Sequence, residues 1–254
     1  MLDQVDRQFS ATVIAENNFK SIYTLGAISM IVVLAGIIID IIFGSVSGGN
    51  LSALPQTAIE RFEQFHDNIL LGLYNLDLLN MINQLILIPA YFALYTAHRH
   101  VNRSYASLAL IVYLVGTMLL VMNNTALPML ELSNKYFASI SESQKALYAA
   151  AGEAMLARGS HGSPNIFLGF FIPNIAGLLM SLVMLRGKIF NKINSWLGIA
   201  GNALMLVYVI LVTFVPGVKN MATVYAMPGG LLLLAWMIMF TVRLFRLGRA
   251  AGRA

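Results

Sequence analysis

Six long apolar runs constrain the fold of this chain more than any other feature. They cover approximately residues 22–43, 70–97, 105–130, 166–185, 193–215 and 227–247. A helix needs roughly 20 apolar residues to cross the hydrocarbon core of a bilayer, and each run has about that length. Backbone amides in lipid must be hydrogen-bonded within their own segment, so each run must be helical. The sequence therefore predicts an all-α fold, a polytopic membrane helical bundle with six transmembrane helices.

The scarcity of charge agrees with this fold. Only 11% of the 254 residues are charged, whereas a soluble domain carries roughly 25%. Because the apolar runs are spread from end to end, we expect residues 1–254 to form a single integral membrane domain. The chain has no cysteine, which excludes disulfides, zinc–thiolate sites, iron–sulfur clusters and cysteine nucleophiles.

Lysine and arginine are distributed unevenly over the loops between the predicted spans. Eleven of the 16 lie on the side that holds both termini and the second and fourth loops, and five lie on the other side. Cationic residues are enriched in cytoplasmic loops, so we expect both termini in the cytoplasm. This placement also accounts for the net charge of +5, and no nucleic-acid partner is expected.

One short helix is predicted in the third, outer loop, over residues 141–158. Ser141 and Gln144 stand three residues apart, as in a capping box at a helix start. Leu147 and Met155 lie about two turns apart and form the beginning of an apolar stripe. We expect this helix to pack against the membrane domain.

The segment 55–67 is also helical in pattern. Pro55 suits the first turn of a helix, and Ile59, Phe62 and Phe65 recur about every three residues. This pattern predicts either an amphipathic helix near the outer interface or an extension of the second span.

The second predicted span is unusually polar. Asp77, Asn80 and Gln84 are spaced i, i+3 and i+7, which places them on one helical face. An ionisable residue within a span should face the bundle interior and have a partner, and we expect that partner to be Asn124 or Asn174. Burial would leave Asp77 either neutral or hydrated through a polar cavity beside it. These five residues are our candidate ligand-binding set, with simple interhelical hydrogen bonding as the alternative.

A second polar group is predicted on the outer side. Glu60, Glu63 and Asp67 fall on one helical face with His66 alongside, and His161 lies in the other large outer loop. Carboxylate and imidazole groups together can bind zinc, manganese or iron. The alternative is a solvated helix face, because the spacing matches no recognised metal motif.

Several segments resemble a known family. They are residues 101–109 (VNRSYASLA), 133–136, 149–157 (AAAGEAMLA), 175–186 (IAGLLMSLVMLR), 195–202 (SWLGIAGN) and 235–248 (AWMIMFTVRLFRLG). In this order they resemble an uncharacterised domain-of-unknown-function family of bacterial and archaeal six-helix integral membrane proteins. The resemblance implies the six-helix layout and a location in a prokaryotic cytoplasmic (inner) membrane. It implies no activity, substrate or cofactor.

Three functions are compatible with these features. The first is a non-enzymatic bundle that binds a lipid or small apolar molecule in an intramembrane pocket. The second is an accessory subunit of a larger membrane complex, and the third is a metal-dependent intramembrane enzyme acting on lipid. The sequence contains no Walker motif, dinucleotide fingerprint or HExxH motif, and we expect no cofactor. The expected partners are membrane lipids, with other membrane subunits or a second copy of the chain as further candidates.

Overall fold

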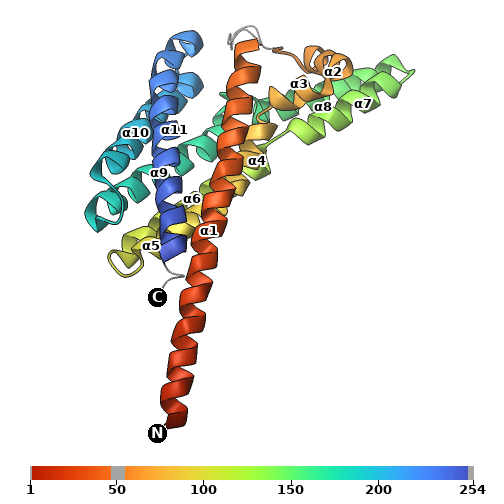
Figure 1. Cartoon of the computed structure of the whole chain (residues 1–254). Helices are drawn as coiled ribbons and strands as arrows, with labels where there is room; N and C mark the ends of the chain where they lie inside the picture. The colour runs from red at the N-terminus through yellow and green to blue at the C-terminus, as the bar shows by residue number, and fades with distance from the viewer. Residues whose placement is uncertain (1, 47–54, 251–254) are drawn as a thin grey trace.

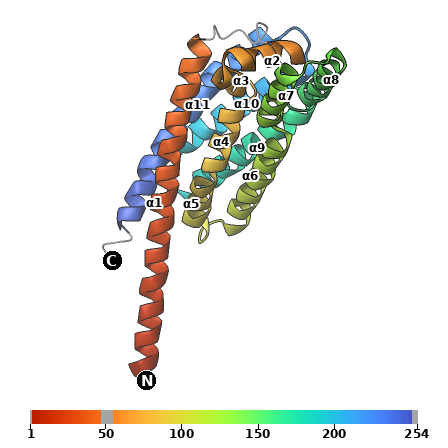
Figure 2. The ribbon, with the colours of Figure 1, turned by 90° about the vertical axis from the view of Figure 1, so that its right-hand side faces the viewer.

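The computed structural model describes residues 2–46 and 55–250, and these residues form helices and no strand. The helices are α1 (Leu2–Val46), α2 (Ala58–Asp67), α3 (Ile69–Tyr74), α4 (Leu78–Ile86), α5 (Ile88–His98), α6 (Arg103–Asn123), α7 (Ala126–Ala138), α8 (Glu142–Gly159), α9 (Pro164–Gly187), α10 (Lys192–Phe214) and α11 (Lys219–Ala250). The long helices α1, α6, α9, α10 and α11 form a bundle with α4 and α5, and α2, α3, α7 and α8 lie together at one end of it (Figures 1 and 2).

Six helical segments of the described chain are long and apolar enough to cross a membrane. They are Lys20–Ile42, Leu78–His98, Arg103–Ala138, Glu142–Gly187, Lys192–Phe214 and Val224–Arg249. The third and fourth segments contain 36 and 46 residues, far more than the roughly 20 that a bilayer requires. The surplus residues form α7 and α8, which belong to the group of helices at one end of the bundle. The prediction of an all-α, six-span membrane protein is therefore confirmed.

The closest packing in the bundle joins α6 to α9. Gly116 of α6 lies against the ring of Pro173, where a Cβ atom would come within 2.5 Å of the proline Cδ. Gly169 of α9 meets the backbone of Leu120, whose Cα would lie 2.8 Å from an added Cβ. Small residues allow two helix backbones to approach closely in this way. The α9–α10, α10–α11 and α1–α11 contacts then complete the bundle.

The short helices α2, α3, α7 and α8 form what we call the cap. Its core contains Phe62 and Phe65 of α2, Met129 of α7 and Leu156 of α8, all buried. In Figure 1 the cap extends sideways from one end of the bundle. These aromatic and aliphatic contacts stabilise the four helices, of which α2 and α3, with 10 and 6 residues, are too short to be stable alone.

The predicted helix over 141–158 is present as α8, but its details differ from the expectation. Ser141 makes no capping bond, because its hydroxyl lies 2.7 Å from that of Ser143 instead. Leu147 is 67% exposed, whereas Met155 packs against the cap core, so only the second half of the expected apolar stripe is covered. Leu156 and Gly152 also contact the other helices of the cap.

Helix α2 is also present and begins three residues after Pro55. Thr57 and Glu60 form a complete capping box: the Thr57 side chain accepts from the Glu60 amide, and the Glu60 carboxylate accepts from the Thr57 amide. Phe62 and Phe65 are buried as the pattern predicted, whereas Ile59 is 42% exposed.

The predicted second span, residues 70–97, is not one continuous helix. Asp77 has a left-handed backbone conformation with φ of 59°, and it separates α3 from α4. A left-handed residue cannot continue a right-handed helix, so the spanning segment starts at Leu78. The polar residue Asp77 is therefore at the helix start rather than within the span.

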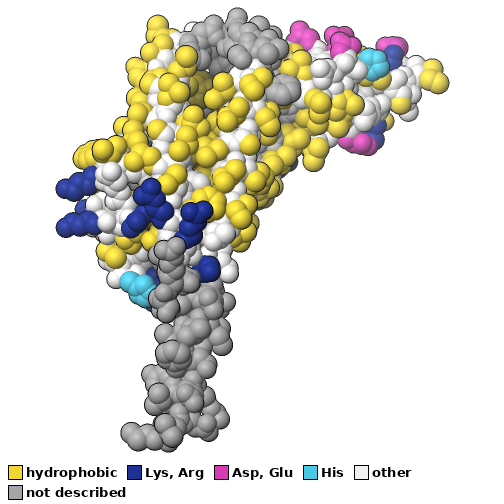
Figure 3. Space-filling model, in the orientation of Figure 1, with side chains coloured by type: hydrophobic (Ala, Val, Ile, Leu, Met, Phe, Trp, Pro, Cys, Tyr) yellow, Lys and Arg dark blue, Asp and Glu magenta, His cyan; other side chains and the backbone are white. Residues whose placement is uncertain are grey.

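Charges separate along the bundle. Basic side chains gather at the end opposite the cap, whereas the acidic side chains visible in Figure 3 lie mainly on the cap. The basic end contains the α5–α6 and α9–α10 turns and the end of α11, with Arg103, Arg186, Lys188, Lys192, Arg243, Arg246 and Arg249.

Candidate binding cavity

A cavity of about 600 Å³ lies between α1, α4, α9, α10 and α11. Most of its wall is apolar and comes from the middle of the long helices. Representative lining residues are Val33, Leu87, Phe170, Met205, Val209 and Met237.

Polar side chains also line this cavity, and they come from four helices and one loop. They are Asp40, Asn80, Asn83, Gln84, His161, Asn174, Tyr208 and Thr213. Three of the five predicted ligand-binding residues, Asn80, Gln84 and Asn174, are therefore brought to one cavity. Asp77 lies behind this wall, only 6% exposed. Asn124 is turned elsewhere, with its amide nitrogen donating to the carbonyl oxygen of Leu76 at 2.9 Å.

A chain of three hydrogen-bonded groups connects Asp77 to the cavity. Nδ1 of His161 lies 3.0 Å from the Asp77 carboxylate, and Nε2 of the same ring lies 3.0 Å from the Tyr208 hydroxyl. The other carboxylate oxygen of Asp77 accepts from the Asn80 amide at 3.0 Å. The loop before α9 thus supplies the histidine that joins the start of α4 to the C-terminal part of α10.

The partner of Asp77 differs from the expectation. Neither Asn124 nor Asn174 reaches it, because the Asn174 amide donates to the Phe170 carbonyl one turn earlier, at 2.8 Å. His161 takes the place instead, from 84 residues further along the chain. Sequence reasoning had placed this histidine in the metal set, and its only signal was a lone imidazole just before a span.

Asp77 directly precedes the second membrane-spanning segment. Burial on its own raises the pKa of this carboxyl, but His161, Asn80 and Arg61 together hold the pKa below its ordinary value. Asp77 is therefore ionised at neutral pH rather than neutral. The arrangement differs from both expected states, because His161, Asn80 and Arg61 stabilise the carboxylate and Asp77 itself does not line the cavity.

Arg61 of α2 is a second charged group that the sequence analysis missed. It is buried within the cap, and its guanidinium donates to the side-chain oxygen of Gln64 at 3.2 Å. Burial lowers its pKa to about 10, and the nearby Asp77 opposes that shift. Arg61 therefore remains a cation at neutral pH and stabilises the Asp77 carboxylate from the cap side.

Asp40 of α1 was missed as well, although it lies in the first predicted span. It lines the cavity close to its polar end, and the Tyr74 hydroxyl donates to its backbone carbonyl at 3.0 Å. An acid inside an apolar run is itself a signal of function, so the sequence could have indicated this residue.

The five predicted metal ligands are not brought together. Glu60 closes the capping box of α2, where the backbone amides of Thr57 and Gln56 lower the pKa of its carboxyl. The ring of His66 stacks on Phe137 at 4.3 Å.

His161 instead belongs to the Asp77 chain, and Glu63 and Asp67 are exposed on α2. Among the side chains that the structure describes, no three histidine or carboxylate groups lie close enough together to hold a metal ion. The structure therefore favours the solvated-face alternative for the residues of α2.

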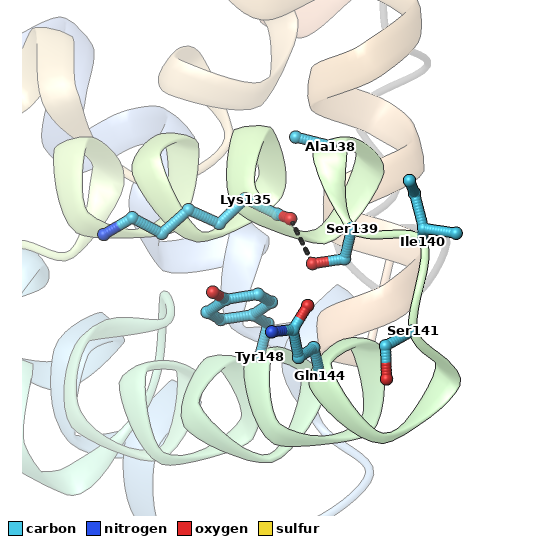
Figure 4. A pocket seen from close by; sticks show the side chains of 7 residues that line it. All are labelled: Lys135, Ala138, Ser139, Ile140, Ser141, Gln144 and Tyr148. Carbon is cyan, nitrogen blue, oxygen red and sulfur yellow. Dashed lines mark hydrogen bonds between the residues drawn. The ribbon is translucent and has the colours of Figure 1, made fainter.

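A second hollow, of about 460 Å³, lies between the tips of α7 and α8 (Figure 4). Tyr148 and Gln144 of α8 face Lys135 of α7 across it. The Ser139 hydroxyl donates to the Lys135 carbonyl at 3.0 Å, and the Lys135 amine pairs with Glu131. These are ordinary helix-end contacts, so this hollow is a weaker candidate than the interhelical cavity.

The fold and the cavity together define a multi-pass α-helical membrane protein with an interhelical pocket. The chain belongs to the DUF4386 family, described as a domain of unknown function, whose profile matches residues 30–241. The matched range includes every residue named above as lining the interhelical cavity. No curated protein and no solved structure matches the chain. The family resemblance seen in the sequence is confirmed.

Proposed function

We propose that this protein binds one amphipathic molecule, a lipid or a lipid-like small molecule, in the interhelical cavity. The observation that carries this proposal is the cavity itself, about 600 Å³ with mainly apolar walls and a few polar groups. Ligand pockets in proteins typically enclose about 300–1,000 Å³ and have this composition.

The arrangement of polar and apolar groups supports an amphipathic occupant. Asp40, His161 and Tyr208 lie toward the cap, since Asp40 is near the end of α1 and His161 precedes α9. Val33 lies seven residues earlier on α1, about 10 Å deeper at 1.5 Å per residue. A bound molecule would therefore have its head group level with the cap and its apolar part in the bundle.

We further propose that the cap lies on the outer side of a prokaryotic cytoplasmic membrane, with both termini in the cytoplasm. The basic end of the bundle, opposite the cap, supports this orientation because cationic residues concentrate on the cytoplasmic side. The occupant would then enter from the outer leaflet.

The two other functions make different demands. A metal-dependent lipid enzyme would need the outer carboxylates gathered around an ion, and the structure gives Glu60, His66 and His161 separate contacts. An accessory subunit would co-purify with a stoichiometric partner chain, which the experiment below would also detect.

Filling the cavity tests the proposal. Gly230 of α11 lines it, and a Cβ atom at this position meets nothing within 4 Å. Gly230→Phe should occupy the space with its ring and exclude the ligand. Ile238→Phe places the same ring on the same helix at a side chain that is 47% exposed, so it serves as the matched control.

The measurement is mass spectrometry of molecules extracted from protein that is purified from its native membrane in mild detergent. We expect about one copy of a defined molecule per chain for the wild type and for Ile238→Phe, and a strong loss for Gly230→Phe. Equal amounts in all three proteins, or no retained molecule in any of them, would overturn the proposal.

A further inference from the structure

The direction of the hydrogen bond between His161 and Asp77 follows from the ionised carboxylate of Asp77. A carboxylate only accepts hydrogen bonds, so Nδ1 of His161 carries the hydrogen that points to it. Nε2 of the same ring lies 3.0 Å from the Tyr208 hydroxyl. A hydroxyl oxygen has two lone pairs, so whichever of these two groups donates, the Tyr208 oxygen keeps an acceptor site for the cavity.

Two amides of the cavity wall also offer acceptors: Asn80 at this end, and Asn174 about 15 Å further into the bundle on α9. The amide nitrogen of Asn80 donates to Asp77, and that of Asn174 donates to the Phe170 carbonyl. Their side-chain oxygens therefore remain as acceptors. Gln84 lies one turn deeper on α4 than Asn80. Its side-chain oxygen already accepts from the Tyr113 hydroxyl at 2.7 Å, so its amide nitrogen remains as a donor.

The charged side chains of the cavity wall also favour a hydrogen-bond donor that carries a positive charge. Asp40 is the one acidic side chain on the cavity wall, and no lysine or arginine of the described chain lines it. Asp40 also lies close enough to Asp77 and His161 to interact with them electrostatically. Asp77 is already paired with His161 and Arg61, so Asp40 is the acidic group that lines the cavity, and it favours a cation over an anion.

We infer that the head group of the occupant is a protonated amine, and that the ligand class is therefore a cationic amphiphile. An ammonium group carries three donors and no acceptor, which matches the Asp40 carboxylate and the oxygens of Tyr208 and Asn80. This inference rests on the proposed function, because it specifies the molecule that the same cavity binds.

Three probes of equal chain length test the inference: dodecylamine, dodecanol and dodecanoate. At pH 7 the amine is a cation and the carboxylate an anion. Binding of each is measured by titration into the purified protein in a non-ionic detergent. We expect the amine to bind at least about tenfold more tightly than the alcohol, and the carboxylate to bind most weakly.

Two variants test whether Asp40 causes the preference for the amine. Asp40→Asn should weaken amine binding by about tenfold or more and leave alcohol binding unchanged. Asp67→Asn makes the same chemical change on the exposed face of α2 and should change neither. The wild-type preference for the amine over the alcohol provides a test that needs no variant, should Asp40→Asn fail to fold.

The outcomes separate this inference from the proposed function. Equal binding of all three probes, lost in Gly230→Phe, would overturn the cationic head group and leave the cavity as the binding site. Amine binding that is unaffected by Gly230→Phe, or no binding of any probe, would overturn both.

Discussion

Asp77 determines the polar end of the cavity through its backbone as well as its side chain. A left-handed conformation costs a non-glycine residue roughly 1–2 kcal/mol, although aspartate and asparagine adopt it more readily than others. The hydrogen bonds from His161 and Asn80 offset this cost. The strained turn directs the carboxylate to His161, and His161 in turn orients Tyr208 at the cavity wall.

Substitution of Asp77 should separate these backbone and side-chain effects. Asp77→Ala loses both hydrogen bonds and disfavours the left-handed turn, so it should destabilise the protein by about 2–4 kcal/mol. Asp77→Asn keeps the shape and tolerates the turn, so its effect should be less than about half as large. Thermal unfolding in detergent measures both variants. Equal melting temperatures for the two would contradict this account of the turn.

At the residue scale, the sequence identified one member of the site better than its partners. Asp77 could be predicted because a buried acid in an apolar run requires a partner. His161 could not be paired with it, since the contact spans 84 residues and depends on the break in the helix at Asp77. The same break explains why Asn124 bonds to Leu76 instead.

At the scale of elements, contact between α6 and α9 depends on glycine at two places. The wall of the cavity is built partly from α9, so the position of this helix affects the site. At Gly116 the neighbouring atoms belong to the Pro173 ring, which has little freedom to move. The packing of this helix pair should therefore be intolerant of even one added methyl group.

Gly116→Ala should consequently destabilise the protein by about 1–3 kcal/mol, the range for an overpacked core. Gly230→Ala is the control, because its Cβ meets nothing, and replacing a helical glycine should stabilise by about 0.5–1 kcal/mol. Thermal unfolding of the two variants should therefore shift in opposite directions. Similar shifts would show that α6 and α9 are not packed as closely as described.

Element boundaries show where sequence patterns are informative. The spans were predictable because their apolar length has a single physical explanation in a bilayer. The break in the predicted span 70–97 was not predictable, since residues on both sides of Asp77 are equally apolar. The start of α8 was predicted from Ser141, yet its hydroxyl contacts Ser143, because a capping pattern does not fix the side-chain rotamer.

At the scale of the whole molecule, the uneven distribution of charged side chains and the position of the cap make the two ends of the protein different. The basic end contains the α5–α6 turn, and the cap carries most of the acidic side chains visible in Figure 3. If the cap faces outward, the polar end of the cavity lies at the level of the outer leaflet.

Cysteine labelling tests this orientation without background, because the chain has no cysteine. His100→Cys lies in the α5–α6 turn and Ser141→Cys lies on the cap, and both positions are exposed. A membrane-impermeant maleimide should label position 141 in intact cells and position 100 only after permeabilisation. The reverse pattern would invert the orientation, and labelling of both in intact cells would contradict the topology.

The central claim is that the interhelical cavity holds one amphipathic molecule. The most direct measurement is an experimental density map of the protein purified from its native membrane without delipidation. Our account predicts an elongated density between α1, α4 and α10 with its broader, polar end within hydrogen-bonding distance of Asp40 and Tyr208. A cavity closed by side chains, or one without such density while lipid is resolved around the bundle, would contradict it.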